Sequence, residues 1–388
     1  MMQRSSQGVL FRQTTSPEPF YAFVPKDLPP EPALSVDGSL ARKLSRADQM
    51  LGRLDGLSRI LPHPDLLIHF YIRKEAVLSS QIEGTQSTLS ELLLFELEDV
   101  SADGGEDVVD VSNYVAALRH GLGRLRGEFP LSLRLIREMH GILLQSGRGS
   151  AHTPGEFRTS QNWIGGTRPG NALYVPPPVI EMQTNLDRFE KFMNGAAEDF
   201  PVLIQCAMIH LQFESIHPFL DGNGRIGRLL VTLLLVERGV LSQPMLYMSL
   251  YLKQYRDRYY SLLQSVRTHG DWEEWIEFFL DGVCVTSEKA VALAQKVLEL
   301  FRRDEAKISA MGARRGSAMQ VMYQLQRSPF VTPTRVAEKS GLSFNTVVTV
   351  LETLREMGML HEITGRTRRR VFRYTEYLEL LDDGTVAV

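Results

Sequence analysis

The stretch from 217 to 228 constrains the fold most, because a glycine-spaced turn there separates two apolar segments. It reads His217-Pro218-Phe219-Leu220-Asp221-Gly222-Asn223-Gly224-Arg225-Ile226-Gly227-Arg228. Residues 202–216 before it show helical spacing, and residues 229–235 after it form a largely apolar, helix-forming run. The pattern predicts two buried helices joined by a tight turn, with polar side chains gathered at the junction.

Each polar residue type in this turn suits the handling of phosphate. Successive N–H groups of a glycine-rich turn at a helix N-terminus favour an anion. Arg225 and Arg228 are three residues apart and share a helix face. Asp221 supplies an oxygen ligand of the kind that magnesium takes beside nucleotide phosphates. His217 has an ordinary pKa near neutrality, which makes it a candidate general base.

The turn has two alternative interpretations. Gly222 to Gly227 fits the dinucleotide-binding pattern G-x-G-x-x-G, but that pattern requires a preceding strand, and residues 202–216 are helical in spacing. A turn with incidental charges is the other reading. It is disfavoured because a helix end needs one glycine rather than three beside histidine, aspartate and two arginines.

The stretch resembles the signature H-P-F-x-[D/E]-G-N-G-R-x-x-R of Fic-domain proteins, and every fixed position is filled. The resemblance implies a mainly α fold, with a helical Fic core and a β-hairpin flap. It also implies transfer of AMP from ATP to a hydroxyl side chain of a target protein, with His217 as the base and Asp221 holding Mg²⁺. The ATP-binding residues would be Gly222, Asn223, Gly224, Arg225, Ile226, Gly227 and Arg228.

An upstream helix ends in Ser79-Ser80-Gln81-Ile82-Glu83-Gly84, where Gly84 suits the C′ position. Ser79 and Glu83 are four apart and share a face, and a glutamate in a last turn is unfavourable with the helix dipole. The segment from Ser79 to Gly84 resembles the inhibitory motif [S/T]-x-x-x-E-[G/N] of many Fic proteins. By that resemblance Glu83 would pair with Arg228 and obstruct the ATP γ-phosphate; the alternative is a solvated helix-end glutamate.

Residues 155–178 lose helical periodicity and read as two extended runs around a Gly/Pro-rich turn, which predicts a hairpin. The segment resembles the Fic flap, which holds a target segment as an added strand; a purely structural hairpin is the alternative. Tyr259 and Tyr260 lie in a helix expected over 249–266, and the resemblance suggests them as a wall for adenine. His140 and His210 are read as structural.

The organisation predicted along the chain has four parts. Residues 1–110 form an N-terminal part, loop-like to about 36, that carries the inhibitory helix; 111–302 form the Fic core; and 303–316 form a linker. Residues 317–388 resemble a winged helix-turn-helix domain, with a recognition helix at 343–357 and wing arginines at 366, 368, 369 and 370. DNA is therefore one candidate partner of this domain, and protein contact is the other.

Composition sets weaker limits. The formal net charge of -3 does not indicate a nucleic-acid partner, and two cysteines in apolar stretches build neither a disulfide framework nor a zinc site. With no apolar run near ~20 residues and no signal-peptide core at its start, the chain is expected to be cytoplasmic.

The function expected from the sequence is an ATP-dependent protein adenylyltransferase, autoinhibited by Glu83 and also able to label itself. Removal of AMP, with Glu83 orienting water, is a variant of this hypothesis. A DNA-binding regulator whose Fic core senses nucleotide is the alternative, and a scaffold without catalysis is disfavoured by the intact signature. The resemblance also implies a homodimer, formed through helical surfaces.

Overall fold

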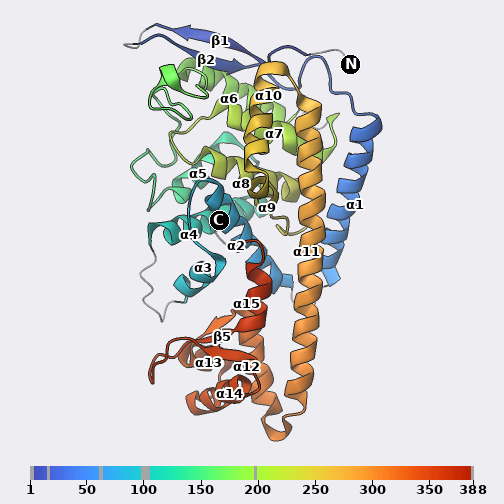
Figure 1. Ribbon diagram of the computed structural model, residues 1–388, viewed down its shortest axis with the longest axis vertical. Helices are drawn as coiled ribbons and strands as arrows, with labels where there is room; N and C mark the ends of the chain where they lie inside the picture. Colours follow the sequence, from blue (N-terminus) through green and yellow to red (C-terminus); the bar gives the residue numbers. More distant parts are fainter. Residues whose placement is uncertain (1–3, 15–17, 61–63, 98–104, 196–198, 386–388) are drawn as a thin grey trace.

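The computed structural model describes residues 4–14, 18–60, 64–97, 105–195 and 199–385 of the 388-residue chain (Figure 1). The fold is mainly helical, as predicted. The helices of its larger part are α1 (Gly38–Ile60), α2 (Pro64–Ile82), α3 (Leu89–Phe95), α4 (Glu106–Arg126), α5 (Leu133–Leu143), α6 (Val179–Met193), α7 (Val202–Ile216), α8 (Asn223–Glu237), α9 (Ser249–Gln254), α10 (Arg256–His269) and α11 (Trp272–Ser309).

Apart from one short helix, η1, the remaining elements lie at the two ends of the chain. The N-terminal strands are β1 (Gly8–Gln13) and β2 (Phe20–Pro25), and the short helix η1 (Pro169–Asn171) lies between α5 and α6. The C-terminal elements are η3 (Gly312–Arg314), α12 (Arg315–Arg327), β3 (Phe330–Val331), α13 (Pro333–Ser340), α14 (Phe344–Glu356), β4 (Leu360–Glu362), β5 (Phe372–Tyr374) and α15 (Thr375–Asp382). None of the helices among the described residues is long and apolar enough to cross a membrane.

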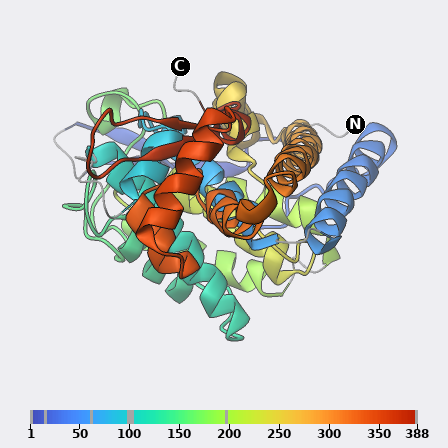
Figure 2. The same ribbon diagram turned by 90° about the horizontal axis from the view of Figure 1, so that it is seen from below.

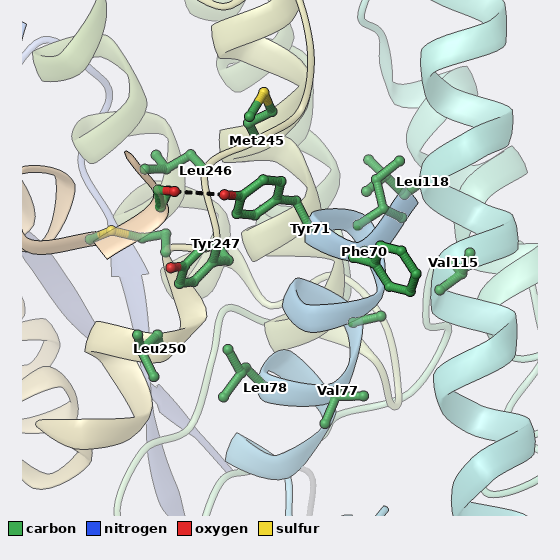
Figure 3. Packing of buried hydrophobic residues seen from close by; sticks show 14 of the residues in the cluster. Phe70, Tyr71, Val77, Leu78, Val115, Leu118, Met245, Leu246, Tyr247 and Leu250 are labelled. Atoms are coloured by element: carbon green, nitrogen blue, oxygen red, sulfur yellow. Dashed lines mark hydrogen bonds between the residues drawn. The ribbon is translucent and has the colours of Figure 1, made fainter. Parts of the chain in front are cut away.

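Helix α2 runs through the centre of the core and is buried on nearly all sides (Figure 3). Tyr71 on α2 stacks on Tyr247, with ring centroids 5.5 Å apart, and its hydroxyl donates to the carbonyl of Ala290 on α11 at 2.6 Å. Phe70 faces the side of α4 that carries Val115 and Leu118. Close packing of this kind leaves the helix little freedom to move.

Three consecutive buried charges on α2 each have their own partners. Arg73 forms a two-pronged pair with Glu96, with N–O distances of 2.7 and 2.9 Å. Lys74 donates to the carbonyls of Leu381 and Asp383. Glu75 accepts from the backbone and hydroxyl of Ser249. Because a buried charge without partners is costly, these contacts fix the rotation and depth of α2, and so the place where its last turn ends.

Helix α11 contains 38 residues and joins the larger part to the C-terminal elements (Figures 1 and 2). Most of the segment predicted as a linker, 303–316, is helical, since α11 continues to Ser309 and α12 begins at Arg315. The reason is that 301–308 retains a buried face. Phe301 and Ile308 are buried, and the buried carboxylate of Asp304 accepts from the hydroxyl of Tyr374 at 2.8 Å.

The C-terminal elements follow the order predicted for 317–388, with two additional elements, the short strand β3 and the helix α15. Strands β3, β5 and β4 form an antiparallel sheet with β5 in the middle. The chain then returns through α15 to α2, where the side chain of Gln81 donates to the carbonyl of Thr385 at 2.8 Å. Figure 1 shows α15 running from the C-terminal sheet towards α2.

Three further predictions of secondary structure need correction. The N-terminal arm is not only loop, because β1 and β2 pair over six residues in the register Gly8 to Pro25. The helix expected over 249–266 is broken at Tyr255, whose ring packs on Tyr251 with centroids 4.6 Å apart. The hairpin expected at 155–178 is reduced to one bridge pair between Ile164 and Tyr174. The reason is that its Gly- and Pro-rich sequence cannot form a continuous ladder of hydrogen bonds between two strands.

Candidate functional site

His217 lies where the buried helix α7 ends. Its backbone is left-handed, with φ 49° and ψ 60°, and its N–H donates to the carbonyl of Phe213 at 2.9 Å. Such a conformation is uncommon for a residue other than glycine, and residues held in it cluster at functional sites. The turn carries the imidazole into a mostly buried position, with 16% of the side chain exposed.

The electrostatic surroundings keep His217 neutral. Burial and the nearby charges of Arg267 and Arg158 lower the pKa of His217 to about 3. Its Nδ1 has no hydrogen-bond partner among the described residues and lies 3.9 Å from Oε2 of Glu214. A neutral imidazole is the form that can accept a proton.

The turn after His217 is closed by Asn223, the first residue of α8. Its side-chain oxygen accepts from the N–H of Phe219 and its side-chain nitrogen donates to the carbonyl of Phe219, both at 2.8 Å. Asn223 is 2% exposed. The sequence predicted Asn223 to be an ATP-binding residue; in the structure both polar atoms of its side chain bond to the backbone of Phe219 and shape the loop.

Replacing Asn223 with alanine should therefore destabilise the fold. The buried N–H of Phe219 would lose its acceptor, at a cost of about 1–3 kcal/mol. Denaturant unfolding of Asn223→Ala measures this, with Asn345→Ala as the control because Asn345 is exposed at the start of α14. Equal stability of the two variants would contradict the clamp.

His140 on α5 also supports the turn, a role that its sequence context did not reveal. The backbone N–H of Gly155 donates to Nδ1 at 2.9 Å, so Nε2 carries the proton and donates to the carbonyl of Asp221 at 3.0 Å. The ring stacks on Phe219 at 3.7 Å between centroids. His140 thus ties the turn to the start of the 155–178 loop.

Acidification should weaken the fold through His140. Burial lowers the pKa of His140 to about 4, so an unfolded chain takes up its proton below the ordinary 6.5 while the folded chain does not. The free energy of unfolding should fall by about 3 kcal/mol on this account between pH 6.5 and 4. His140→Gln removes that share, so its unfolding free energy should depend less steeply on pH than that of the parent. Parallel pH profiles would refute the assignment.

Arg228 connects α8 to the end of α2. Its Nε donates to the hydroxyl of Ser79 at 2.7 Å, and its Nη2 donates to the carbonyl of Ser79 at 3.0 Å and to Oε1 of Glu83 at 2.7 Å. Arg228 and Ser79 are buried, while the side chain of Glu83 is 38% exposed. Gly84 follows with φ 95°, as expected for a C′ residue.

The carboxylate of Glu83 stands over the N-terminus of α8. A Cβ added at Gly224 would collide with Oε1 of Glu83. Burial alone would raise the pKa of Glu83, but the charge and hydrogen bond of Arg228 outweigh it and hold the pKa below its ordinary 4.5. Glu83 is therefore an anion at neutral pH, seated where a helix N-terminus favours negative charge.

Asp221 and Arg225 lie on the other side of the turn. The backbone N–H of Gly222 donates to Oδ1 of Asp221 at 2.6 Å, and Nη2 of Arg225 lies 3.8 Å from the same oxygen. Arg225 is buried and also lies 3.9 Å from Asp110, a residue that the sequence did not single out. The described residues contain no cluster of three metal-ligating side chains, but magnesium at nucleotides needs only one or two carboxylates beside phosphate oxygens.

The loop at 155–178 is fastened to the signature by polar side chains. Arg158, 1% exposed, donates to the carbonyls of His217, Ser160 and Pro177. Asn162 donates to the carbonyl of Phe219 at 2.8 Å, and Gln161 donates to that of Pro176 at 2.9 Å. These residues position the loop beside His217, although neither charge nor spacing marks them in the sequence.

Four predicted nucleotide-contact residues differ in accessibility. Tyr260 is 40% exposed, whereas Tyr259 is buried and bonded through its hydroxyl to Nε2 of His210 at 2.9 Å. Ile226 is fully buried, and the carbonyl of Gly227 bonds to Nδ1 of His210 at 3.0 Å. Of this group only Tyr260 presents side-chain surface to a ligand; Tyr259 and Ile226 support the site from the core.

Two family models match this chain. Residues 41–123 match the Fic/DOC family N-terminal model, and residues 130–235, which include the whole signature, match the Fic/DOC family model. The first segment contains the Ser79–Glu83 turn and the second contains His217 and Arg228. The chain thus contains a segment that matches the Fic/DOC N-terminal model and a segment that matches the Fic/DOC model.

Curated relatives carry the name protein adenylyltransferase Fic. The protein of Aedes aegypti is 35% identical over 152 residues, which are 39% of this chain and 27% of the relative. That of Drosophila yakuba is 28% identical over 205 residues, which are 52% of this chain and 38% of the relative. The matches thus span about a quarter to two-fifths of the relatives' own length.

Solved structures share the fold. A Fic family protein from Desulfovibrio desulfuricans superposes with a TM-score of 0.57 at 18% identity, covering 89% of this chain and 98% of the other. A Fic domain containing signaling protein from Bacteroides thetaiotaomicron has a TM-score of 0.50 at 20% identity, covering 65% of this chain and 95% of the other. The likeness to the first structure extends over most of the chain, and at these identities it speaks for the fold alone.

Proposed function

We propose that this chain transfers AMP from ATP to hydroxyl groups of proteins and that Glu83 holds it in an inhibited state. The observation that carries the proposal is the contact of Glu83 with Arg228 over the N-terminus of α8. A carboxylate already occupies the place where this helix end and Arg228 would receive phosphate. The names of the curated relatives support AMP transfer as the reaction.

In this reaction the residues of the site would have the following roles. The turn at Gly222–Gly224 and the arginines would bind the triphosphate, with Arg225 and Arg228 balancing its charge. Asp221 would hold magnesium, which neutralises phosphate oxygens when bound. His217 would take the proton from the acceptor hydroxyl as that oxygen attacks the α-phosphorus, and pyrophosphate leaves. Tyr260 would face the nucleoside, and the loop at 155–178 would hold the acceptor segment.

The inhibited state follows from competition for one guanidinium. Arg228 donates two hydrogen bonds to Ser79 and one to Glu83, so a γ-phosphate would have to displace the carboxylate of Glu83. Two anions at this helix end would also repel each other. Because the pKa of Glu83 is held below 4.5, the pair should persist across the neutral range and open only at strongly acidic pH.

The position of the label in ATP tests the reaction. The Glu83→Gly form should incorporate radioactivity from ATP labelled at the α-phosphate and none from ATP labelled at the γ-phosphate. Label from the γ-position would mean phosphate transfer, and no label from either would remove the proposal. Incubating the labelled chain without ATP, with Glu83 present or replaced, measures whether Glu83 also supports removal of AMP.

A DNA-binding regulator is a second candidate, favoured by the C-terminal elements. Arg366, Arg368 and Arg369 are exposed between β4 and β5, and Phe344 and Asn345 are exposed at the start of α14. Exposed arginines on a wing would meet phosphates, and the start of a recognition helix would meet bases. Duplex binding that weakens steeply with salt and is lost in Arg368→Ala would support this candidate. Absence of binding at low salt would exclude it.

A further inference from the structure

Strand β1 is an exposed sheet edge. Its sheet has only two strands among the described residues, β1 and β2, so one side of β1 lacks a neighbouring strand. Three consecutive apolar residues on it are exposed: Val9 by 61%, Leu10 by 64% and Phe11 by 47%. Figure 1 shows β1 and β2 projecting at the end of the molecule opposite the C-terminal elements.

This edge lacks the usual protections against pairing. Edge strands of monomeric proteins are commonly blunted by charges, prolines or covering segments. Within Gly8–Gln13 there is no proline, and Arg12 is the single charged residue. A run of three exposed apolar residues is unfavourable in water unless another surface covers it.

The exposure does not come from a loosely attached hairpin. The N–H of Gln7 donates to the carbonyl of Arg267 at 3.0 Å, and the N–H of Phe23 donates to that of Val175 at 2.8 Å. Phe20 and Ala22 on β2 are buried against Val175. The hairpin is thus fixed to α10 and to the loop beside the site, while β1 is held away from the core.

We propose that β1 pairs antiparallel with β1 of a second copy of this chain. A two-fold axis perpendicular to a sheet places residues of equal parity opposite each other. With Leu10 opposite its own copy, Val9 faces Phe11 and Arg12 faces Gly8, so apolar side chains meet and the two arginines stay apart. Cross-strand pairs of this kind are favourable, whereas like charges directly opposite are not.

The edge of β1 is complementary to itself, and this selects a second copy of the chain as the partner that pairs with it. The neighbouring register, with Phe11 opposite itself, places Arg12 opposite Leu10 and also avoids a clash of charges. The result is one four-stranded sheet through both copies. The proposal depends only on strand edges and not on AMP transfer, and it differs from the helical dimer surface that the family resemblance suggested.

The mass in solution tests the pairing. A junction of two six-residue strands is smaller than a standard interface of ~1,600 Å², so we expect a dimer that dissociates on dilution. Sedimentation over about 1 to 100 µM should show the parent passing from monomer to dimer. Leu10→Lys should remain monomeric, while Phe344→Lys, the same change at an exposed apolar residue of α14, should behave like the parent.

Cross-linking tests the register. Both native cysteines, Cys206 and Cys284, are buried, so an introduced thiol is the accessible one among the described residues. Leu10→Cys should form a disulfide-linked dimer on mild oxidation, since directly opposite Cβ atoms approach the spacing that a disulfide needs, and Phe344→Cys should not. A parent that stays monomeric throughout, or a Leu10→Lys form that still dimerises, would overturn the proposal.

Discussion

Replacing Glu83 with glycine is expected to raise ATP-dependent labelling of the chain about 5- to 150-fold, the usual range for a coupling of 1–3 kcal/mol between two binding events. The change removes the carboxylate that now bonds to Arg228 and covers the N-terminus of α8. Arg228 keeps both contacts with Ser79, so its guanidinium should stay in place for phosphate. The measurement is incorporation of α-labelled ATP at equal protein concentration.

Two comparison variants make this result specific. Glu356→Gly removes another exposed helix-end glutamate, at the end of α14, and should leave labelling unchanged. Glu83→Gln keeps an amide oxygen for Arg228 but loses the charge, so it should label to an intermediate level. If Glu83→Gly labels no faster than the parent, the pair with Arg228 is structural rather than inhibitory.

The local structure of the site could be predicted from the sequence because it depends on short spacings. Three glycines and two arginines within twelve residues specify a turn and the start of a helix, and Gly84 marks the end of α2. The pairing of Glu83 with Arg228 spans 145 residues and came from resemblance rather than from spacing. Only the packing of α2 between α4 and α9 brings the two halves together.

What could not be predicted depends on the tertiary environment. Asn223 and His140 are polar residues whose hydrogen-bond partners are backbone groups of a loop. Such contacts cannot be predicted from a pattern of side chains in the sequence. The break at Tyr255 leaves apolar periodicity intact, so it is invisible to a helical count. Conversely, the prolines at 17, 19 and 25 suggested a loop, although Pro19 lies between the two strands and Pro25 at the end of β2, and neither prevents β1 from pairing.

Removing the imidazole of His217 should reduce labelling of the Glu83→Gly form by about 10²- to 10⁴-fold, the usual contribution of a positioned base. Burial and the charges of Arg267 and Arg158 lower the pKa of His217 to about 3, so its imidazole is neutral at neutral pH. Labelling should be measured in the Glu83→Gly background, where the starting rate is high enough to follow such a loss.

The left-handed backbone of His217 determines which substitution gives a clean answer. Alanine is found less often than histidine in the left-handed region at φ 49°, so a loss in His217→Ala could arise from a shifted turn. Asparagine adopts this conformation more readily and still lacks a basic nitrogen. His217→Asn should therefore lose as much labelling as His217→Ala while unfolding at a higher denaturant concentration. His269→Ala, at the exposed end of α10, should label like its parent. Substantial labelling by His217→Asn would show that the turn, and not the imidazole, is what the reaction requires.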